Sequence, residues 1–477
     1  MLLVKRAGSI FKVRALLPPV GSARDAADSP ACAVWMSAVL GYRGRGELAG
    51  YGAALPAAQF TDKFHAVHIP TLIARKREGE TLSSEEIGWL VDGYVNGDVA
   101  DYQMSAFAMA VCFKGMRASE TAALTLAMMR SGDVFMHPPG ALVVDKHSTG
   151  GIGDKVSLIL APLVACAGCR VPMVSGRGLG ITGGTLDKLE SIPGFRVGIG
   201  MDEAAEILAD LGVVMMGQTD RFCPADKKLY ALRDVTGTVP SIPLITASIM
   251  SKKMAESLER LVLDVKYGTG AFMKTRAEAE LLADGMIAVG KEMGVEVFAV
   301  LNPMSEPTGR TVGNALEVIE ALECLDGGGP DDLRKVVLDL SETIAGVPRA
   351  FLAAILDDGT ARRKFDDLVL RQGGNPDDLL RLAKIHKAAV IREVKAMSSG
   401  KILAVDAGII GQASLELGAG RAKAEDAVDF AVGFDRLVKS GEHVSQGDII
   451  VRIHARSEQA ADRAEQACRS AVTFELA

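Results

Sequence analysis

The chain has 477 residues, of which 48% are hydrophobic, and this is enough for several globular domains with ordinary buried cores. Its formal net charge of -7 argues against a broad basic surface for a nucleic-acid backbone, although a local positive pocket for a small anion is compatible with it. The seven cysteines follow no regular spacing, which is typical of free thiols in a reducing compartment, so we expect a cytoplasmic protein.

The N-terminal segment differs from the rest because its basic residues outnumber its acidic ones: Lys5, Arg6, Lys12, Arg14, Arg24, Arg43 and Arg45 stand against Asp25, Asp28 and Glu47. No apolar core of signal-peptide length follows the early charges, and Pro18 and Pro19 interrupt the best candidate. We therefore predict a poorly ordered extension over residues 1–65. An over-long reading frame with its true start near Met36 and a cleaved presequence are the two explanations considered.

Helical periodicity begins near residue 66. Ser83 and Glu86 form a capping box, and the apolar residues after it recur on one face of a helix: Ile87, Leu90, Val91 and Tyr94. The stretches 102–116 and 119–130 are rich in Ala, Met and Leu at helical spacing, and a Pro-Pro-Gly sequence follows them. These patterns predict an all-helical segment over 66–130.

The middle of the chain alternates short apolar runs with helical stretches, as a parallel sheet requires; the runs at 141–144, 170–174 and 261–265 are expected strands. The most apolar stretch, 156–169, falls short of the roughly 20 residues of a membrane-spanning helix, so we predict no such helix. Its Cys166 and Cys169 form a CxxC with no second pair or neighbouring histidines, so we expect packing within an apolar helix and no metal site.

From about residue 394 the pattern changes to short alternating strands with glycine turns, among them Gly441 and Gly447, and this predicts a β-rich module over 394–477. Similar turns occur in lipoyl and biotinyl carrier domains. Lys395, however, is followed by Ala396 and Met397 and does not lie between two methionines at a hairpin tip, which argues against a carrier role.

Two glycine-rich segments are candidates for binding a phosphate. The first, DKHSTGGIGD at 145–154, follows an apolar strand and precedes an apolar helix, so glycine N–H groups and a helix N-terminus can approach an oxyanion. The second, SGRGLGITGGT at 175–185, again lies between a strand and a helix, and two such loops can converge where neighbouring parallel strands end. The predicted phosphate ligands are Lys146, Ser148, Ser157, Ser175 and Thr185.

Two other interpretations of these loops are open. Hydroxyls and glycines in such positions also serve simply to cap helices. Gly178, Gly180 and Gly183 match the dinucleotide-binding pattern GxGxxG, with Glu203 twenty residues beyond. That match is weak, because it lies in the second strand-loop unit and not the first.

A third segment combines aromatic surface, hydroxyl and cation. Tyr230 and Arg233 are three residues apart and Ser248 and Lys252 are four apart, so each pair shares a face of a helix. The combination suits a flat heterocycle with carbonyl oxygens. A solvated basic face is the alternative interpretation.

Together these segments resemble the thymidine and pyrimidine nucleoside phosphorylase family, whose signature S-G-R-[GA]-L-x2-T-G-G-T-x-D-K-x-E is met in full from Ser175 to Glu190. The resemblance continues through DKHSTGGIGDK, LYALRDVTGTVPSIPLITASIMSKK and LVLDVKYGTGAF and extends from about residue 66 to the C-terminus. It implies an α domain in two pieces, 66–130 and 226–258, and a larger α/β domain with a mixed or parallel sheet over 141–225 and 259–393. It also implies a homodimer formed through the α domain, and closure of the two domains around both substrates.

The resemblance further implies that inorganic phosphate attacks the sugar anomeric carbon of a pyrimidine nucleoside, giving free base and an α-pentose 1-phosphate without metal or organic cofactor. The five phosphate ligands keep that role, and Tyr230, Arg233, Ser248 and Lys252 would hold the pyrimidine. His147, Arg233 and Lys252 would be catalytic, stabilising the departing base. The expected partners are therefore a nucleoside and phosphate, with no nucleic acid or membrane.

Substrate choice depends on finer features. Met173 resembles the thymidine branch of the family, whereas enzymes that also accept ribosides tend to have lysine there, so we expect thymidine and deoxyuridine as substrates. Ile181 departs from the histidine common in both branches. The alternatives are a broader enzyme that also cleaves uridine, an AMP-cleaving phosphorylase, a phosphoribosyltransferase of similar fold, and a binding protein without activity.

Overall fold

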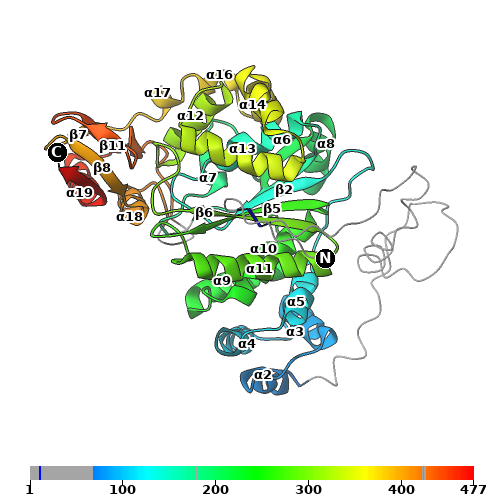
Figure 1. The fold of residues 1–477 in the computed structure, drawn as a ribbon. Helices are drawn as coiled ribbons and strands as arrows, with labels where there is room; N and C mark the ends of the chain where they lie inside the picture. The colour runs from blue at the N-terminus through cyan, green and yellow to red at the C-terminus, as the bar shows by residue number, and fades with distance from the viewer. Residues whose placement is uncertain (1–9, 12–67, 179, 422, 424–425, 477) are drawn as a thin grey trace.

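A computed structural model describes residues 10–11, 68–178, 180–421, 423 and 426–476 (Figure 1). The predicted extension over 1–65 lies outside these residues, except for the two-residue strand β1 (Ile10–Phe11). Across the described residues, no helix is both long and apolar enough to cross a membrane.

The central sheet is parallel apart from its edge. Strands β2 (Val144–Ser148), β5 (Arg260–Tyr267) and β6 (Glu296–Pro303) pair in parallel, as do β3 (Val171–Ser175) and β4 (Val213–Gly217). A parallel bridge between Val143 and Arg170 joins the two groups in the order β4-β3-β2-β5-β6, with β1 antiparallel outside β6. The chain builds β2 to β4 in one direction and then crosses back to β5, so the topological switch point lies between β2 and β5, where ligands bind in such sheets.

One predicted strand is misplaced. Residues 141–144 were expected to be the strand, but β2 continues through Ser148 because its backbone pairs with β5 up to Asp264. Lys146 and His147 therefore lie within a strand and not in the loop after it.

Helices cover both faces of this sheet (Figure 1). One face carries α6 (Val156–Cys166), α8 (Met201–Leu211), α12 (Asn314–Leu325), α13 (Asp331–Ala345), α14 (Arg349–Asp357) and α15 (Thr360–Arg371), and α10 (Ile242–Ala255) and α11 (Arg276–Glu292) lie on the other. The short helices are α7 (Thr185–Glu190), α16 (Pro376–Leu379) and α17 (Leu382–Ile385). Cys166 ends α6, but Cys169 lies in the turn beyond it, buried against the sheet core, which corrects the prediction that one helix holds both.

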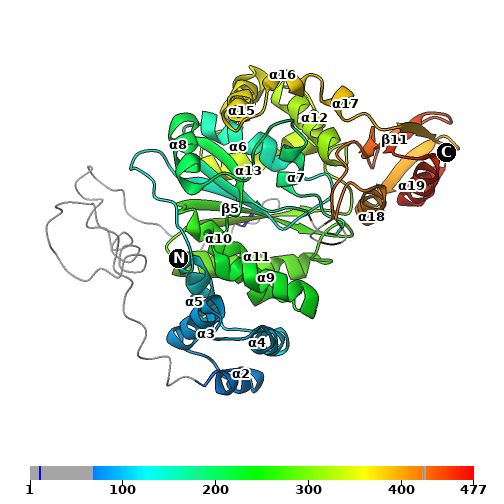
Figure 2. The ribbon, with the colours of Figure 1, turned by 180° about the vertical axis from the view of Figure 1, so that it is seen from behind.

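Helices distant in sequence share a separate core. They are α2 (Ile69–Arg77), α3 (Ser84–Asn96), α4 (Asp101–Lys114), α5 (Ala118–Arg130), α9 (Pro224–Thr236) and part of α10. The predicted capping box is confirmed, since Ser83 accepts from Glu86 N at 3.1 Å and Glu86 accepts from Ser83 N at 2.8 Å. Figure 2 shows α9 to α11 between the sheet and α3 to α5. Met250 and Met254 of α10 pack into the sheet core, so α10 belongs to both cores.

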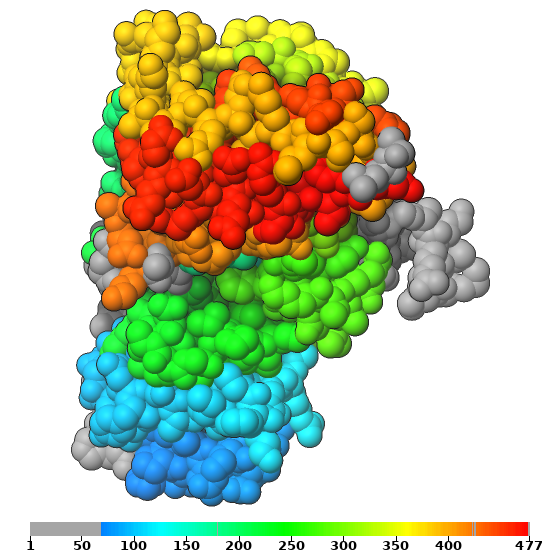
Figure 3. All heavy atoms as spheres, turned by 90° about the vertical axis from the view of Figure 1, so that its left-hand side faces the viewer, coloured from blue at the N-terminus to red at the C-terminus, as the bar shows by residue number. Residues whose placement is uncertain are grey.

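The C-terminal module holds two three-stranded antiparallel sheets, ordered β10-β8-β12 and β7-β11-β9. Their strands are β7 (Val390–Lys395), β8 (Gly400–Val405), β9 (Gly433–Asp435), β10 (His443–Val444), β11 (Ile449–Ala455) and β12 (Val472–Leu476). The predicted β-rich module is confirmed, and it also contains the helices α18 (Ala407–Leu417) and α19 (Glu458–Ala471). Figure 3 looks onto this module (orange to red), with the green middle segments and the blue N-terminal helices below it.

Candidate active site

Strand β2 distributes its polar side chains to two faces of the sheet. Because side chains alternate along a strand, Lys146 and Ser148 share one face and Asp145 and His147 the other. Lys146 Nζ lies 3.4 Å from Ser157 Oγ of α6, whereas Asp145 forms an ion pair with Lys253 of α10. The switch-point strand thus directs an ammonium and a hydroxyl toward α6 and an imidazole toward α10.

The face toward α6 holds a compact set of buried charges. Lys146 Nζ lies 3.7 Å from Asp154 Oδ1 and 3.6 Å from Asp264 Oδ2. Lys266 Nζ lies 2.7 Å from Asp264 Oδ2 and 3.8 Å from Asp154 Oδ2. Burial by itself raises the pKa of Asp154, but Lys146, Lys266 and the hydrogen bond from Ser148 prevail and hold it well below its ordinary value. Two lysines therefore balance two carboxylates.

The first glycine loop, 149–155, is fixed by backbone contacts on both sides. Gly150 N donates to Ser148 Oγ at 3.2 Å, and Thr149 Oγ1 accepts from Lys266 N at 2.9 Å. A Cβ on Gly153, whose φ is +72°, would lie 2.5 Å from Thr308 O, so only glycine fits. The loop leads directly into the N-terminus of α6, where helix geometry favours an anion.

A side chain of α7, Asp187, holds the backbone of the second glycine loop. Ser175 ends β3 and Thr185 begins α7, so the two hydroxyl residues flank the loop. Gly178 N donates to Asp187 Oδ2 of α7 at 2.7 Å, and a Cβ on Gly184 would lie 2.0 Å from Gly178 N. Lys146 contacts Ser157 directly and is linked to Ser148 through Asp154. Ser175 ends the neighbouring strand β3, and Thr185 begins the helix after it.

The residues expected to hold a pyrimidine lie on α9 and α10. Lys252 Nζ donates to Ser248 O at 2.6 Å and to Ser248 Oγ at 3.2 Å, and it pairs with the buried Asp226 of α9. Tyr230 is 39% exposed, with the Arg233 guanidinium carbon 5.9 Å from its ring centroid. The structure therefore groups Ser248 with Lys252 and Tyr230 with Arg233.

Arg233 is more enclosed than its sequence position suggested. Its guanidinium donates to the carbonyl oxygens of Thr238 at 3.2 Å, Val239 at 2.7 Å and Leu244 at 3.1 Å. These bonds use three of its five N–H groups, and its side chain is only 1% exposed, so in this structure Arg233 fixes the connection between α9 and α10.

His147 lies among cations on the α10 side of the sheet. Burial lowers its pKa most, and the charges of Lys253, Lys252 and Lys146 lower it further, to well below 6.5. The imidazole is therefore neutral at physiological pH and can donate a hydrogen bond from one ring nitrogen. His147 therefore lies near enough to both Lys146 and Lys252 for their charges to act on it.

A pH titration by NMR tests this state of His147. Between about pH 7.5 and about pH 6 its C2 proton, assigned with the variant His147→Gln, is expected not to shift, and Lys252→Met is expected to bring the pKa closer to the ordinary value. Since the unfolded chain binds this proton more readily, His147 contributes a fall in the free energy of unfolding as pH drops below 6.5. Titration of His147 at or above 6.5 would contradict the assignment.

Sequence reasoning missed the carboxylates that hold the cations: Asp145, Asp154, Asp187, Asp226, Asp264 and Glu256. Asp264 had a signal, because a single aspartate inside an apolar run is rarely buried without a partner. Asp145, Asp187 and Asp226 pair with cations distant in sequence, so spacing alone could not find them. Asp154 and Glu256 lie close in sequence to Lys146 and Lys253, so their pairing was within reach of the sequence.

Three family models match the chain. The helical bundle domain of the glycosyl transferase family matches residues 70–132, its a/b domain matches 140–354, and the pyrimidine nucleoside phosphorylase C-terminal domain matches 401–475. Pyrimidine-nucleoside phosphorylases of Staphylococcus haemolyticus (strain JCSC1435) and Geobacillus stearothermophilus are 46% and 45% identical over 401 residues, covering 82% of the chain and 93% of each relative. The chain belongs to the pyrimidine nucleoside phosphorylase family. This confirms the family predicted from the glycine loops.

A solved structure shares the architecture at lower similarity. The anthranilate phosphoribosyltransferase of Thermus thermophilus matches with a TM-score of 0.53 and 17% identity, covering 63% of the chain and 98% of that protein. At this identity the likeness shows a common fold alone, a helical bundle with a larger α/β domain.

Proposed function

We propose that the chain catalyses the reversible phosphorolysis of pyrimidine nucleosides. A phosphate oxygen forms a bond to the anomeric carbon from the face opposite the base while the bond from that carbon to the base nitrogen breaks. The base leaves with the bonding electron pair, and the sugar is released as an α-pentose 1-phosphate. The observation that carries the proposal is the placement of Lys146 and His147 on opposite faces of β2, next to the switch point.

On the phosphate side, the proposed ligands are Lys146, Ser148, Ser157, Ser175 and Thr185. Because Asp154 and Asp264 already balance the lysines, the cluster carries no large excess charge, and phosphate would be held mainly by hydroxyl and backbone donors together with Lys146. Phosphate is the co-substrate, and the proposed reaction needs no other cofactor.

On the base side, the proposed contacts come from Tyr230, Arg233, Ser248 and Lys252. Negative charge grows on the pyrimidine carbonyl oxygens as the glycosidic bond breaks, and the Lys252 ammonium and the two remaining N–H groups of Arg233 would stabilise it. A neutral His147 would donate to the carbonyl near that bond.

For the sugar, we propose a preference for deoxyribosides, with thymidine and deoxyuridine as substrates. The proposal rests on Met173, which is fully buried in the sheet core on β3, two residues before Ser175, where members of the family that also accept ribosides tend to have lysine. The relatives named pyrimidine-nucleoside phosphorylases support the wider alternative, in which uridine is also cleaved.

The test is release of free base from thymidine, deoxyuridine and uridine, with and without inorganic phosphate. Phosphate-dependent cleavage of the deoxyribosides alone is the expected result, and equal cleavage of uridine would replace it with the wider activity. Without any phosphate-dependent cleavage, the proposed function would be wrong.

We also propose a homodimer formed through the helical domain. On α4, the side chains of Tyr102, Met109 and Phe113 are 77%, 36% and 80% exposed and recur at helical spacing, an apolar stripe unusual for a free surface. Sedimentation would test this, with a concentration-independent monomer as the contrary outcome.

A further inference from the structure

The C-terminal module touches both glycine loops, although no predicted ligand belongs to it. Its helix α18 follows the carboxyl end of the sheet, with Ala407 N donating to Ser305 O at 3.0 Å just after β6. The module core includes Ile152 of the first loop, and Ile181 of the second loop packs against it. One module therefore contacts the two loops that would hold phosphate.

Arg421 makes the most specific of these contacts. Its carbonyl oxygen accepts from Gly180 N at 2.8 Å, and its Nη1 lies 2.5 Å from Asp187 Oδ1. The other oxygen of Asp187 accepts from Gly178 N at 2.7 Å. Arg421 is only 7% exposed, so its guanidinium and Asp187 form a buried ion pair. Asp187 and the Arg421 carbonyl oxygen hold the loop at two backbone positions, Gly178 N and Gly180 N.

Helix α18 reaches both loops at one glycine. A Cβ on Gly411 would lie 2.5 Å from Ile152 Cδ1, 3.1 Å from Ile152 Cγ1 and 3.3 Å from Ile181 Cβ. The helix thus approaches the loops as closely as a residue without a side chain allows.

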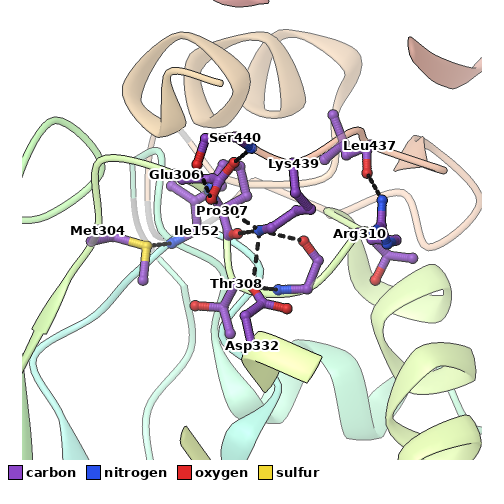
Figure 4. A network of polar contacts seen from close by, with 12 residues as sticks. Ile152, Met304, Glu306, Pro307, Thr308, Arg310, Asp332, Leu437, Lys439 and Ser440 are labelled. Carbon is purple, nitrogen blue, oxygen red and sulfur yellow. Dashed lines mark hydrogen bonds and ion pairs between the residues drawn. The ribbon is translucent and has the colours of Figure 1, made fainter. Parts of the chain in front are cut away.

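The first loop is tied to the module by a second route, through residues 304–310 (Figure 4). Ile152 N donates to Met304 Sδ at 3.3 Å, and Thr308 N donates to Ile152 O at 3.0 Å. Lys439 Nζ of the module donates to Pro307 O at 2.5 Å, and in the other direction Arg310 Nη1 donates to Leu437 O of the module at 3.0 Å. The C-terminal module is therefore connected by hydrogen bonds to the second loop directly and to the first loop through residues 304–310.

We propose that the C-terminal module sets the geometry of the phosphate site, with Arg421 as the positioning residue for the second glycine loop. The inference rests on the proposed function, since it takes phosphate as the ligand of these loops. Arg421 acts through Asp187 and the loop backbone and touches no substrate. Its loss should therefore weaken phosphate binding and leave the nucleoside contacts on α9 and α10 unchanged.

Steady-state kinetics of the full chain separate these effects. In Arg421→Met we expect the KM for phosphate to rise at least about tenfold while the KM for thymidine stays within about twofold. Arg452→Met is the matched control, because Arg452 Nε bonds Asp435 Oδ1 at 2.7 Å within the module and touches neither loop. It should keep the phosphate KM of the wild type.

Two further variants keep the proposal testable if Arg421→Met folds poorly. Gly411→Ala adds one methyl group that displaces Ile152 and Ile181, so a raised phosphate KM is expected, with the better helix propensity of alanine offsetting part of the packing cost in Tm. Asp187→Asn keeps the size of the side chain and leaves Arg421 in place, and it should also raise the phosphate KM, because Asp187 links Arg421 to Gly178 N.

Different experimental results would contradict this inference and the proposed function. Wild-type turnover with an unchanged phosphate KM in Arg421→Met and Gly411→Ala would overturn the inference alone. A wild type without phosphate-dependent turnover would overturn the proposed function and this inference with it.

Discussion

Replacing Lys146 with methionine is expected to lower kcat/KM for phosphate by a factor on the order of 10²–10³, the cost typical of removing one preorganised charged donor. The ammonium lies among Ser157, Asp154 and Asp264 at the carboxyl end of β2, where the topology places the ligand. Without it, two buried carboxylates would face one lysine, and phosphate would be repelled by the charge that remains. The measurement is initial rate against phosphate concentration at saturating thymidine.

Stability must be separated from binding in this experiment. Removing one partner from a buried ion pair costs about 3–5 kcal/mol, so Lys146→Met should also unfold more readily. Lys76→Met is the matched control, because Lys76 Nζ pairs with the buried Glu120 at 2.8 Å in the helical domain. A similar loss of stability with a wild-type phosphate KM is expected there. If both variants lost phosphate affinity equally, Lys146 would have no specific role.

The sequence located the glycine loops better than the extents of the strands before them. The glycine loops were located from composition alone, since a positive φ at Gly153 and the close approach of Gly184 to Gly178 leave no room for a side chain. The extent of β2 was wrong because the residues 145–148 are polar, and apolar runs mark strands only where both faces are apolar. Pairing with β5 decides that boundary, and this is a tertiary contact.

Lys146 and Lys252 were predicted from the sequence, whereas their carboxylate partners, and the buried cation Arg421, were not. Lysine beside glycine-rich turns is a local signal, whereas Asp226 and Lys252 are 26 positions apart and Asp187 and Arg421 are 234 apart. A pattern within a window cannot pair such residues. For the same reason, the sequence predicted the β-rich C-terminal module but not its contacts with Gly180 and Ile152.

Replacing Lys252 with methionine should act on the opposite half of the reaction. We expect kcat for thymidine phosphorolysis to fall by a factor on the order of 10²–10³, with the KM for phosphate little changed, since the ammonium stabilises charge that develops only as the base departs. In the free protein Lys252 is held by Asp226 and Ser248 on two helices, so its position is fixed before substrate binds. Initial rates with each substrate varied in turn measure both constants.

A nearby lysine provides the control for Lys252. Lys227 lies on α9, and its side chain is 55% exposed and paired with Asp220, so Lys227→Met removes the same charge from a surface pair and should leave kcat near the wild type. Nucleosides whose bases differ as leaving groups distinguish two roles of Lys252: stabilising the departing base and binding the intact substrate. If Lys252 stabilises the departing base, a nucleoside whose base is a better leaving group should lose less rate in Lys252→Met than thymidine does. Equal losses for both nucleosides would assign Lys252 to binding the intact substrate.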